Sequence, residues 1–226
     1  MQRSSFDIVG FDLDGTLVDT SGDLAAAVNH ALALADRAPL TTAQVTGMIG
    51  GGAKHMLAQA LAASGGCDDA AFRTHYKAML AYYGDHLSVH SRPFPGAVAA
   101  LDALAARGVQ LAVVTNKFES FATRLLTDLG LADRFACVIG GDTLGPGNAK
   151  PSPAPILAMI DRLGGGRAAF VGDSIYDVQA AQAAGVPAIA VSFGFLLGPI
   201  EDLHADAVID GYDQLIPTLD ALCATS

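Results

Sequence analysis

The residues of this chain whose types and spacing could do chemistry are aspartates that follow strand-like segments. Asp12 and Asp14 stand at the end of an apolar run and on a glycine turn, in the sequence FDIVGFDLDGTLVD. Asp173 and Asp177 repeat the arrangement in VGDSIYD. Open α/β sheets bind ligands in the crevice beyond the carboxyl ends of their strands, which is where such carboxylates would lie. The two pairs therefore suggest phosphoryl chemistry with a divalent metal.

Two further segments end in residues that could contact a phosphoryl group. Thr115 and Asn116 follow the apolar run Ala112–Val114, and their hydroxyl, amide and backbone N–H groups could hold phosphate oxygens or simply cap the next helix. Lys150 lies in a loop that three following prolines stiffen, although most lysines in such loops are only solvated. In a parallel sheet all of these segment ends meet at one edge, which favours a shared site.

These residue types fit one reaction, phosphoryl transfer through an aspartate. An aspartate can attack phosphorus and form an acyl phosphate, which divides one difficult hydrolysis into two easier steps. Magnesium prefers oxygen ligands, so Asp12, Asp173 and the main-chain carbonyl of Asp14 would bind Mg²⁺ beside the substrate phosphate. Lys150 would stabilise negative charge on the transferring group. The carboxylate of Asp14 is then left to protonate the leaving oxygen and to take a proton from water.

The order of apolar patterns predicts a parallel α/β core that a helical block interrupts. From Gly96 onward, buried strand-like runs alternate with helical patterns, which is typical of a doubly wound, Rossmann-like parallel sheet. Between the first strand and this region the apolar spacing is helical only. We therefore expect a discontinuous α/β core of residues 1–16 and 93–226, and an all-helical cap domain of residues 17–92 inserted after the first strand.

The individual elements follow from the same patterns. The later core strands are expected at residues 109–114, 135–139, 168–171, 188–191 and 207–209, and the core helices at 96–107, 119–129, 153–163 and 176–184. In the cap, Ser21 would cap a first helix, Thr41 and Gln44 form a capping box for a helix that ends at Gly50, and further helices span residues 53–63 and 69–86.

Composition and charge restrict the partners of the chain. With 226 residues, of which 51% are hydrophobic, it can bury a large core. Its net charge of -10 argues against nucleic acid and anionic membranes, because these partners require clustered lysine and arginine. The chain shows no signal-peptide pattern and no apolar run long enough to span a bilayer, so we expect a cytoplasmic protein. Cys67, Cys137 and Cys223 are widely spaced and are expected to be reduced packing residues.

Four motifs in this order resemble those of the haloacid dehalogenase-like phosphohydrolase superfamily: DLDGT, VVTN, a lysine before proline at Lys150, and GDSIYD. The resemblance covers essentially the whole chain and implies a magnesium-dependent hydrolase whose helical cap closes over the site and selects the leaving group. It also implies roles for the matching residues: Asp12 as nucleophile, Asp14 as general acid/base, Thr115 as phosphate binder, Lys150 as charge stabiliser, Asp173 as metal ligand and Asp177 as its support. The chain departs from the family pattern after GDS, where Ile175 and Tyr176 replace polar residues and could alter cap contacts.

Within the superfamily, the glycine turn Ile49–Ala53, VVTNK and IGGDTL are most similar to phosphoglycolate phosphatases, and this resemblance predicts 2-phosphoglycolate as the substrate. On this interpretation Gly51 and Gly52 bring the backbone close to a small substrate carboxylate, with Lys54 nearby. The alternative is that the turn is only a corner between two helices, because glycine serves equally well to end a helix. The sequence leaves both interpretations open.

Other functions stay open or are disfavoured on particular residues. A phosphatase for sugar phosphates or pyrophosphate, or a sugar-phosphate mutase, would keep all four motifs. Dehalogenases and phosphonoacetaldehyde hydrolases of this fold do not carry the carboxylate of Asp14, so its presence favours phosphate ester hydrolysis. The helical insertion argues against a phosphoacceptor receiver domain, and the complete set of charged residues argues against a non-catalytic binding protein. The expected partner is a small phosphorylated metabolite, and either a monomer or a homodimer is compatible with the sequence.

Overall fold

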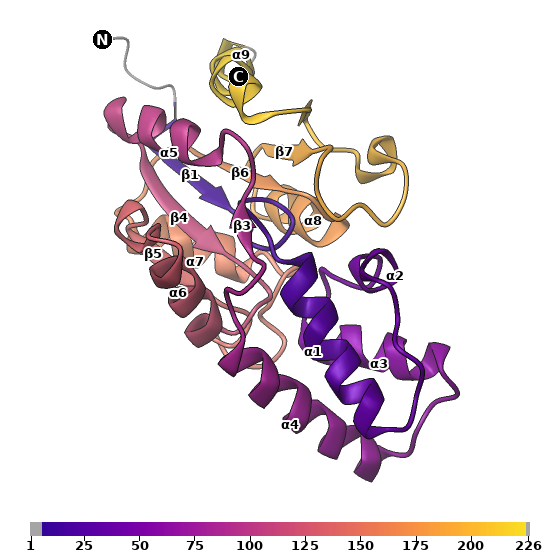
Figure 1. Cartoon of the computed structure of the whole chain (residues 1–226). Coiled ribbons are helices and arrows are strands. Elements are labelled where there is room, and N and C mark those ends of the chain that lie inside the picture. Colours follow the sequence, from indigo (N-terminus) through magenta and orange to yellow (C-terminus); the bar gives the residue numbers. More distant parts are fainter. Residues whose placement is uncertain (1–5, 225–226) are drawn as a thin grey trace.

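The structure is a computed structural model that describes residues 6–224. Within these residues a six-stranded parallel sheet forms the core, in the order β5-β4-β1-β6-β7-β8 (Figure 1). Its strands are β1 (Ile8–Phe11), β4 (Gln110–Val114), β5 (Cys137–Ile139), β6 (Ala168–Gly172), β7 (Ala188–Val191) and β8 (Ala207–Ile209). The chain winds from β1 to one edge of the sheet and then from β6 to the other, so the predicted doubly wound α/β fold is confirmed.

Helices cover both faces of this sheet. One face packs against α7 (Ala154–Arg162) and α8 (Ile175–Ala183), and the other against α5 (Ala97–Ala106), α6 (Glu119–Asp128) and α9 (Leu215–Ala224). Successive strand residues alternate between the two hydrophobic clusters. In β4, for example, the cluster around α7 and α8 contains Ala112 and Val114, whereas the opposite cluster contains Leu111 and Val113. This two-sided burial explains why the strands read as continuous apolar runs.

The first strand, β1, lies between β4 and β6 in the middle of the sheet, and all four of its residues are buried. Gly10 faces a side chain of α7 at close range, because a Cβ atom at this position would lie 2.5 Å from Met159 Sδ. The glycine therefore allows helix and strand to approach. A rigid, central β1 fixes the position of Asp12, the next residue along the chain.

Four helices form a second lobe beside the core, and we refer to them as the helical lobe (Figure 1). They are α1 (Ser21–Leu34), α2 (Thr42–Thr46), α3 (Ala53–Ala63) and α4 (Asp69–Asp85). The chain enters the lobe through β2 (Val18–Asp19) and leaves it through β3 (Arg92–Pro93), and these two short strands pair in antiparallel fashion. The two crossings between core and lobe therefore lie side by side, at the ends of the predicted insertion. The division into two domains with boundaries at 16 and 93 stays a prediction.

Asp23, in the first turn of α1, ties the two crossings together. Its buried carboxylate accepts hydrogen bonds from the backbone N–H groups of His90 and Ser91, and from the hydroxyl of Ser91 at 2.7 Å. These hydrogen bonds give the carboxylate the polar partners that a buried oxygen requires. The entry into the lobe and the exit from it are thus fixed relative to each other.

Two expectations for the helix ends of the lobe are wrong, and one is confirmed. The Thr41–Gln44 capping box is present, but the helix it opens ends at Thr46 with Gly47 as its C-cap, before the glycines that we expected to end it. Ser21 does not cap α1. Thr20 occupies that position; its hydroxyl oxygen accepts no cap hydrogen bond, and the hydroxyl donates to Asp14 at 2.6 Å.

The remaining segments are short, and the surface is mixed. Three 3₁₀ turns lie at Ala132–Arg134, Ile200–Leu203 and Tyr212–Gln214, and the C-terminal helix α9 is an element that the apolar pattern did not predict.

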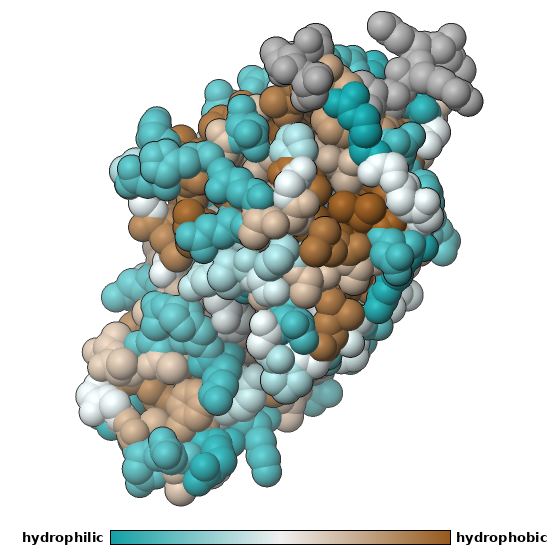
Figure 2. Space-filling view, turned by 180° about the vertical axis from the view of Figure 1, so that it is seen from behind, coloured by the Kyte–Doolittle hydropathy of each residue, from teal (hydrophilic) through white to brown (hydrophobic). Residues whose placement is uncertain are grey.

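Seen from behind, most of the strongly hydrophobic surface lies on the core half of the molecule (Figure 2). Cys137 and Cys223 are half-buried, whereas Cys67 is exposed and is not the packing residue that we expected. Among the helices of residues 6–224, none has the length and apolar character required to cross a membrane.

Candidate active site

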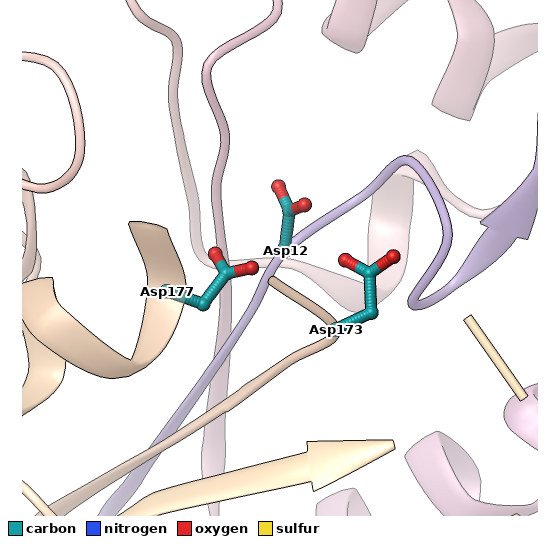
Figure 3. Close-up of side chains that lie close together, drawn as sticks. All are labelled: Asp12, Asp173 and Asp177. Atoms are coloured by element: carbon teal, nitrogen blue, oxygen red, sulfur yellow. The ribbon is translucent and has the colours of Figure 1, made fainter. Parts of the chain in front are cut away.

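Asp12 and Asp173 lie at the point where the winding of the sheet reverses. Asp12 follows β1 and Asp173 follows β6, and these two strands are neighbours in the sheet. Asp177, in the first turn of α8, completes a buried group of three carboxylates (Figure 3). One oxygen from each of the three lies within 4.8 Å of the others. The predicted convergence of Asp12 and Asp173 is therefore seen, with Asp177 as the third member of the cluster.

Burial and mutual repulsion make these carboxylates hard to ionise. Burial is the main cause that raises the pKa of Asp12 to about 6, with contributions from Asp177 and Asp14, while Lys150 opposes the shift. The pKa of Asp173 is raised well above its ordinary value for the same reason, first by burial and then by Asp177 and Asp12. A cluster of this kind has an excess of negative charge that a cation can relieve.

Lys150, a cation, contacts the cluster directly. Its Nζ lies 2.9 Å from Asp12 Oδ1, and it donates hydrogen bonds to Asp177 Oδ1 at 2.5 Å and to the carbonyl oxygen of Val114 at 2.9 Å. Burial alone would lower the pKa of Lys150, but Asp12 and Asp177 together raise it above its ordinary value. The lysine therefore stays charged beside the expected nucleophile.

Asp177 has two partners that the sequence does not reveal. Besides Lys150, it accepts hydrogen bonds from the backbone N–H and the hydroxyl of Ser174, in a capping box that opens α8. Oδ1 of Asp177 thus contacts Lys150, and Oδ2 contacts Ser174 at the start of α8. Its expected support of Asp173 stays a prediction, whereas its contact with Lys150 is a feature of the structure.

The carboxylate of Asp14 lies outside the cluster and is held by Lys117 and Thr20. Lys117 Nζ donates to both oxygens of Asp14, at 2.7 and 2.8 Å, and Thr20 donates to one of them. Burial would lower the pKa of Lys117, but Asp14 and Tyr83 raise it above its ordinary value. Sequence reasoning missed Lys117, although it lies two residues after Thr115 in the motif VVTNK and could have been found there.

Thr115 and Asn116 both lie at the site, at the end of β4. Thr115 is buried, and its hydroxyl oxygen accepts a hydrogen bond from the backbone N–H of Lys117 at 3.2 Å. The side-chain amide of Asn116 donates to the carbonyl oxygens of Gly50 and Lys150, each at 3.0 Å. Asn116 therefore connects the glycine turn of the helical lobe to the core loop that carries Lys150.

A cavity of about 190 Å³ separates the core from the helical lobe above these residues. The expected site residues that line it from the core are Asp12, Asp14, Thr115 and Asn116, and those from the lobe are Gly51, Gly52 and Lys54. Apolar side chains of α3 and α4 complete its walls, including Met56, Met79 and Tyr83.

Gly52 forms a corner between two helices and also lines the cavity. It is the N-cap of α3 and has a φ of 86°, a conformation that favours glycine, so the turn is indeed a helix corner. The same residue lines the cavity together with Gly51 and Lys54. The ring of Tyr176 approaches the turn as well, because a Cβ atom on Gly50 would lie 3.5 Å from it. Contact of the turn with a substrate stays a prediction.

The carboxylate cluster fits a small divalent cation. Asp12 Oδ1 is buried, and among the described residues its close polar partner is Lys150, which forms an ion pair with it at 2.9 Å but no hydrogen bond of good geometry. The cluster offers oxygen donors only, which is the ligand set that Mg²⁺ prefers. Gly15 leaves room beside it, because a Cβ atom there would lie 2.1 Å from Asp173 Oδ2. The expected contribution of the main-chain carbonyl of Asp14 stays a prediction.

We expect Asp173→Asn to abolish stabilisation of the protein by magnesium. At a magnesium concentration of about 100 times Kd, a single site should raise the Tm of the wild type by roughly 5–10 °C. The variant should show almost no increase, because the amide supplies no negative charge to the metal. Without magnesium it should be more stable than the wild type, since it removes a buried charge that is repelled by Asp177 and Asp12. Differential scanning fluorimetry with magnesium and with chelator measures both effects.

Asp161→Asn is the matched control, because Asp161 is exposed and lies outside the cluster. It should show the full magnesium effect. A full increase of Tm in Asp173→Asn would remove Asp173 from the metal site.

Comparisons with known proteins agree with this geometry. A family model described as haloacid dehalogenase-like hydrolase matches residues 6–185. A phosphoglycolate phosphatase of Rhodospirillum rubrum is 45% identical over 212 residues, which are 91% of this chain and 87% of that protein. One of Agrobacterium fabrum is 42% identical over 212 residues, 92% of this chain and 90% of its own length. The crystal structure of a predicted phosphoglycolate phosphatase from Haemophilus somnus is similar with a TM-score of 0.90 and 31% identity, covering 96% of this chain and 99% of that one.

Proposed function

The chain belongs to the haloacid dehalogenase-like hydrolase family, and we propose that it hydrolyses 2-phosphoglycolate to glycolate and phosphate through an aspartyl phosphate on Asp12. At the coarser level it is a phosphoric monoester hydrolase, similar over most of its length to phosphoglycolate phosphatases. The helical lobe is, on this proposal, the cap that closes over the site, and the cavity between lobe and core receives the leaving group.

One observation carries the proposal. Asp12 lies beside Lys150, in one buried cluster with Asp173, at the floor of a cavity that is also lined by Asp14 and Thr115. The proposed nucleophile, acid and phosphate-binding hydroxyl thus line one small space, and a cation lies directly beside the proposed nucleophile. This is the set of groups that phosphoryl transfer through a carboxylate requires.

The protein residues divide the reaction between them. Asp12 attacks phosphorus, so that a bond from its carboxylate oxygen to phosphorus forms as the ester P–O bond breaks. Asp14 gives a proton to the departing ester oxygen and later takes one from the attacking water, which closes the proton balance of the cycle. Lys150 stabilises the charge on the phosphoryl oxygens, and Thr115 binds one of them. Closure of the helical lobe excludes bulk water while the phosphoryl enzyme exists.

Asp12 and Asp173 would hold the magnesium ion, with Asp177 close to them. When bound there, Mg²⁺ supplies positive charge that neutralises the phosphoryl oxygens and lets one anion attack another.

Phosphate release from a panel of esters tests the proposed function. The panel contains 2-phosphoglycolate, p-nitrophenyl phosphate, sugar phosphates and pyrophosphate, each with magnesium and with chelator. Release that depends on magnesium and is concentrated on 2-phosphoglycolate is the expected result. Broad release would keep the phosphatase and reject the substrate, and no release from any ester would reject the phosphatase in favour of a mutase or a binding protein.

We expect Lys54→Ala to weaken the binding of carboxylated substrates specifically. Lys54 lies in the first turn of α3 and lines the cavity, but its side chain is exposed, so the interaction is partly screened. The Michaelis constant for 2-phosphoglycolate should rise by about fivefold with kcat little changed, and that for ethyl phosphate by less than about twofold. Steady-state kinetics on both esters gives the comparison.

Lys77→Ala serves as the control, because Lys77 is exposed and does not line the cavity. It should leave both Michaelis constants unchanged. An equal rise for both esters in Lys54→Ala would show that Lys54 does not recognise the carboxylate.

A further inference from the structure

Asp14, the proposed acid and base, is engaged by a lysine in this structure. Both of its oxygens accept hydrogen bonds from Lys117, and one also accepts from Thr20. To give a proton to the ester oxygen, Asp14 must turn one oxygen toward it, and it must then give up part of its contact with Lys117. Another anion must then pair with the ammonium group of Lys117, because an unpaired buried charge is costly.

Lys117 has little else around it that could take over this role. Its side chain is 5% exposed, and its ammonium lies 4.9 Å from the centre of the Tyr83 ring. The hydroxyl of Tyr83 is itself buried and, within the part of the chain that the structure describes, makes no hydrogen bond of good geometry, although it is close enough to Lys117 to help raise the pKa of that lysine. Asp14, Lys117 and Tyr83 all line the cavity. An ammonium group and an unpaired hydroxyl in one buried wall are suited to an incoming anion.

The shape of 2-phosphoglycolate places such an anion beside Asp14. One methylene group joins the ester oxygen, which Asp14 must protonate, to the carbon of the carboxylate. The carboxylate of the bound substrate therefore lies close to Asp14. Once Asp14 has given its proton to the ester oxygen it is negatively charged, and two like charges then meet unless a cation lies between them. Among the described residues, two lysines line the cavity: Lys54, exposed on the helical lobe, and Lys117, which contacts Asp14 directly.

We propose that Lys117 binds the carboxylate of the substrate and, by moving from Asp14 to that carboxylate, frees an oxygen of Asp14 to face the ester oxygen. The hydroxyl of Tyr83 gives the carboxylate a second hydrogen bond. This inference rests on the proposed function, since it takes a small carboxylated phosphomonoester as the substrate. The consequence is that the carboxylate of the substrate promotes hydrolysis of the phosphate ester to which it belongs. An ester without a carboxylate leaves Lys117 on Asp14 and reacts slowly even when it is bound.

The test compares 2-phosphoglycolate with ethyl phosphate, which has the same ester linkage and lacks the carboxylate. In the wild type, the preference for 2-phosphoglycolate should lie mainly in kcat. Lys117→Met should reduce kcat/KM for 2-phosphoglycolate by about 100-fold, and that for ethyl phosphate by less than about tenfold. Lys117→Arg should restore part of the preference, because it keeps the charge. Lys77→Met, on an exposed lysine outside the cavity, should match the wild type.

Tyr83→Phe keeps the test decisive if Lys117→Met does not fold. The change removes one hydroxyl and no charge, so the fold should be retained. It should reduce kcat/KM for 2-phosphoglycolate by roughly three- to tenfold, the effect of losing a hydrogen bond to a charged group, and leave ethyl phosphate unchanged.

The outcomes separate this inference from the proposed function. If the wild type prefers 2-phosphoglycolate and the Lys117 and Tyr83 variants lose activity equally on both esters, Lys117 only holds Asp14 and the inference is overturned. If the wild type cleaves ethyl phosphate but not 2-phosphoglycolate, the proposed substrate is wrong and the inference is wrong with it.

Discussion

Asp12→Asn is expected to reduce phosphate release from every ester by about ten-thousand-fold or more while the protein stays folded, because removal of a nucleophile costs about this much in enzymes with covalent intermediates. The amide has nearly the shape of the carboxylate but is a poor nucleophile. Asp12 is buried within a cluster of acids, so loss of its charge relieves repulsion. The free energy of unfolding should therefore be equal to or higher than that of the wild type without magnesium.

The measurement combines kinetics with detection of the intermediate. Rapid acid quenching of the wild type during turnover, followed by peptide mass spectrometry, should find a phosphoryl group on the peptide that contains Asp12. The variant should show none, and its unchanged circular dichroism spectrum would show that the loss is chemical. Asp161→Asn should behave like the wild type in both assays. Full activity in Asp12→Asn would contradict the covalent mechanism.

Asp14→Asn should separate the two halves of the reaction. With 2-phosphoglycolate, whose leaving oxygen needs a proton, the steady-state rate should fall by roughly 100- to 10,000-fold. With p-nitrophenyl phosphate the leaving group needs no acid, so the first step should remain fast. The second step still lacks a base for the attacking water. Phosphoryl enzyme should therefore accumulate and release about one equivalent of p-nitrophenol in an initial burst.

Stopped-flow absorbance measures the burst, and acid quenching measures the phosphoryl enzyme that accompanies it. The wild type serves as the reference, because its general base should prevent accumulation. Equal losses on both esters with no burst would contradict the assignment of Asp14 as acid and base. Such a result would leave Asp14 as a partner of Lys117 alone.

The part of the site that could be predicted depends on backbone topology. Parallel strands that alternate with helices bring their carboxyl ends to one edge, so the meeting of Asp12, Asp173 and Thr115 follows from strand order. The rule needs no knowledge of side-chain conformation, because each residue lies directly after a strand. The order of strands in the sheet adds that β1 and β6 are neighbours.

The part that could not be predicted depends on long or diverted side chains. Lys117 and Asp14 are 103 residues apart, and their contact depends on a flexible side chain that most proteins leave in solvent. Thr20 takes the N-cap position of α1 that we expected Ser21 to occupy, and its hydroxyl donates to Asp14. In both cases the contact depends on where a side chain points in the folded protein. The spacing and periodicity of residues in the sequence do not reveal such contacts.

The pairing of β2 with β3 has a consequence for how such a protein can change. These strands hold the start and the end of the insertion side by side. With respect to the core, the whole helical lobe is therefore equivalent to the loop of a β-hairpin. The entropy of closing such a loop rises only slowly with the number of residues in it. Residues can therefore be added to the lobe or removed from it, or another lobe grafted in its place, at little cost to the core. Specificity for the leaving group can thus evolve separately from the nucleophile.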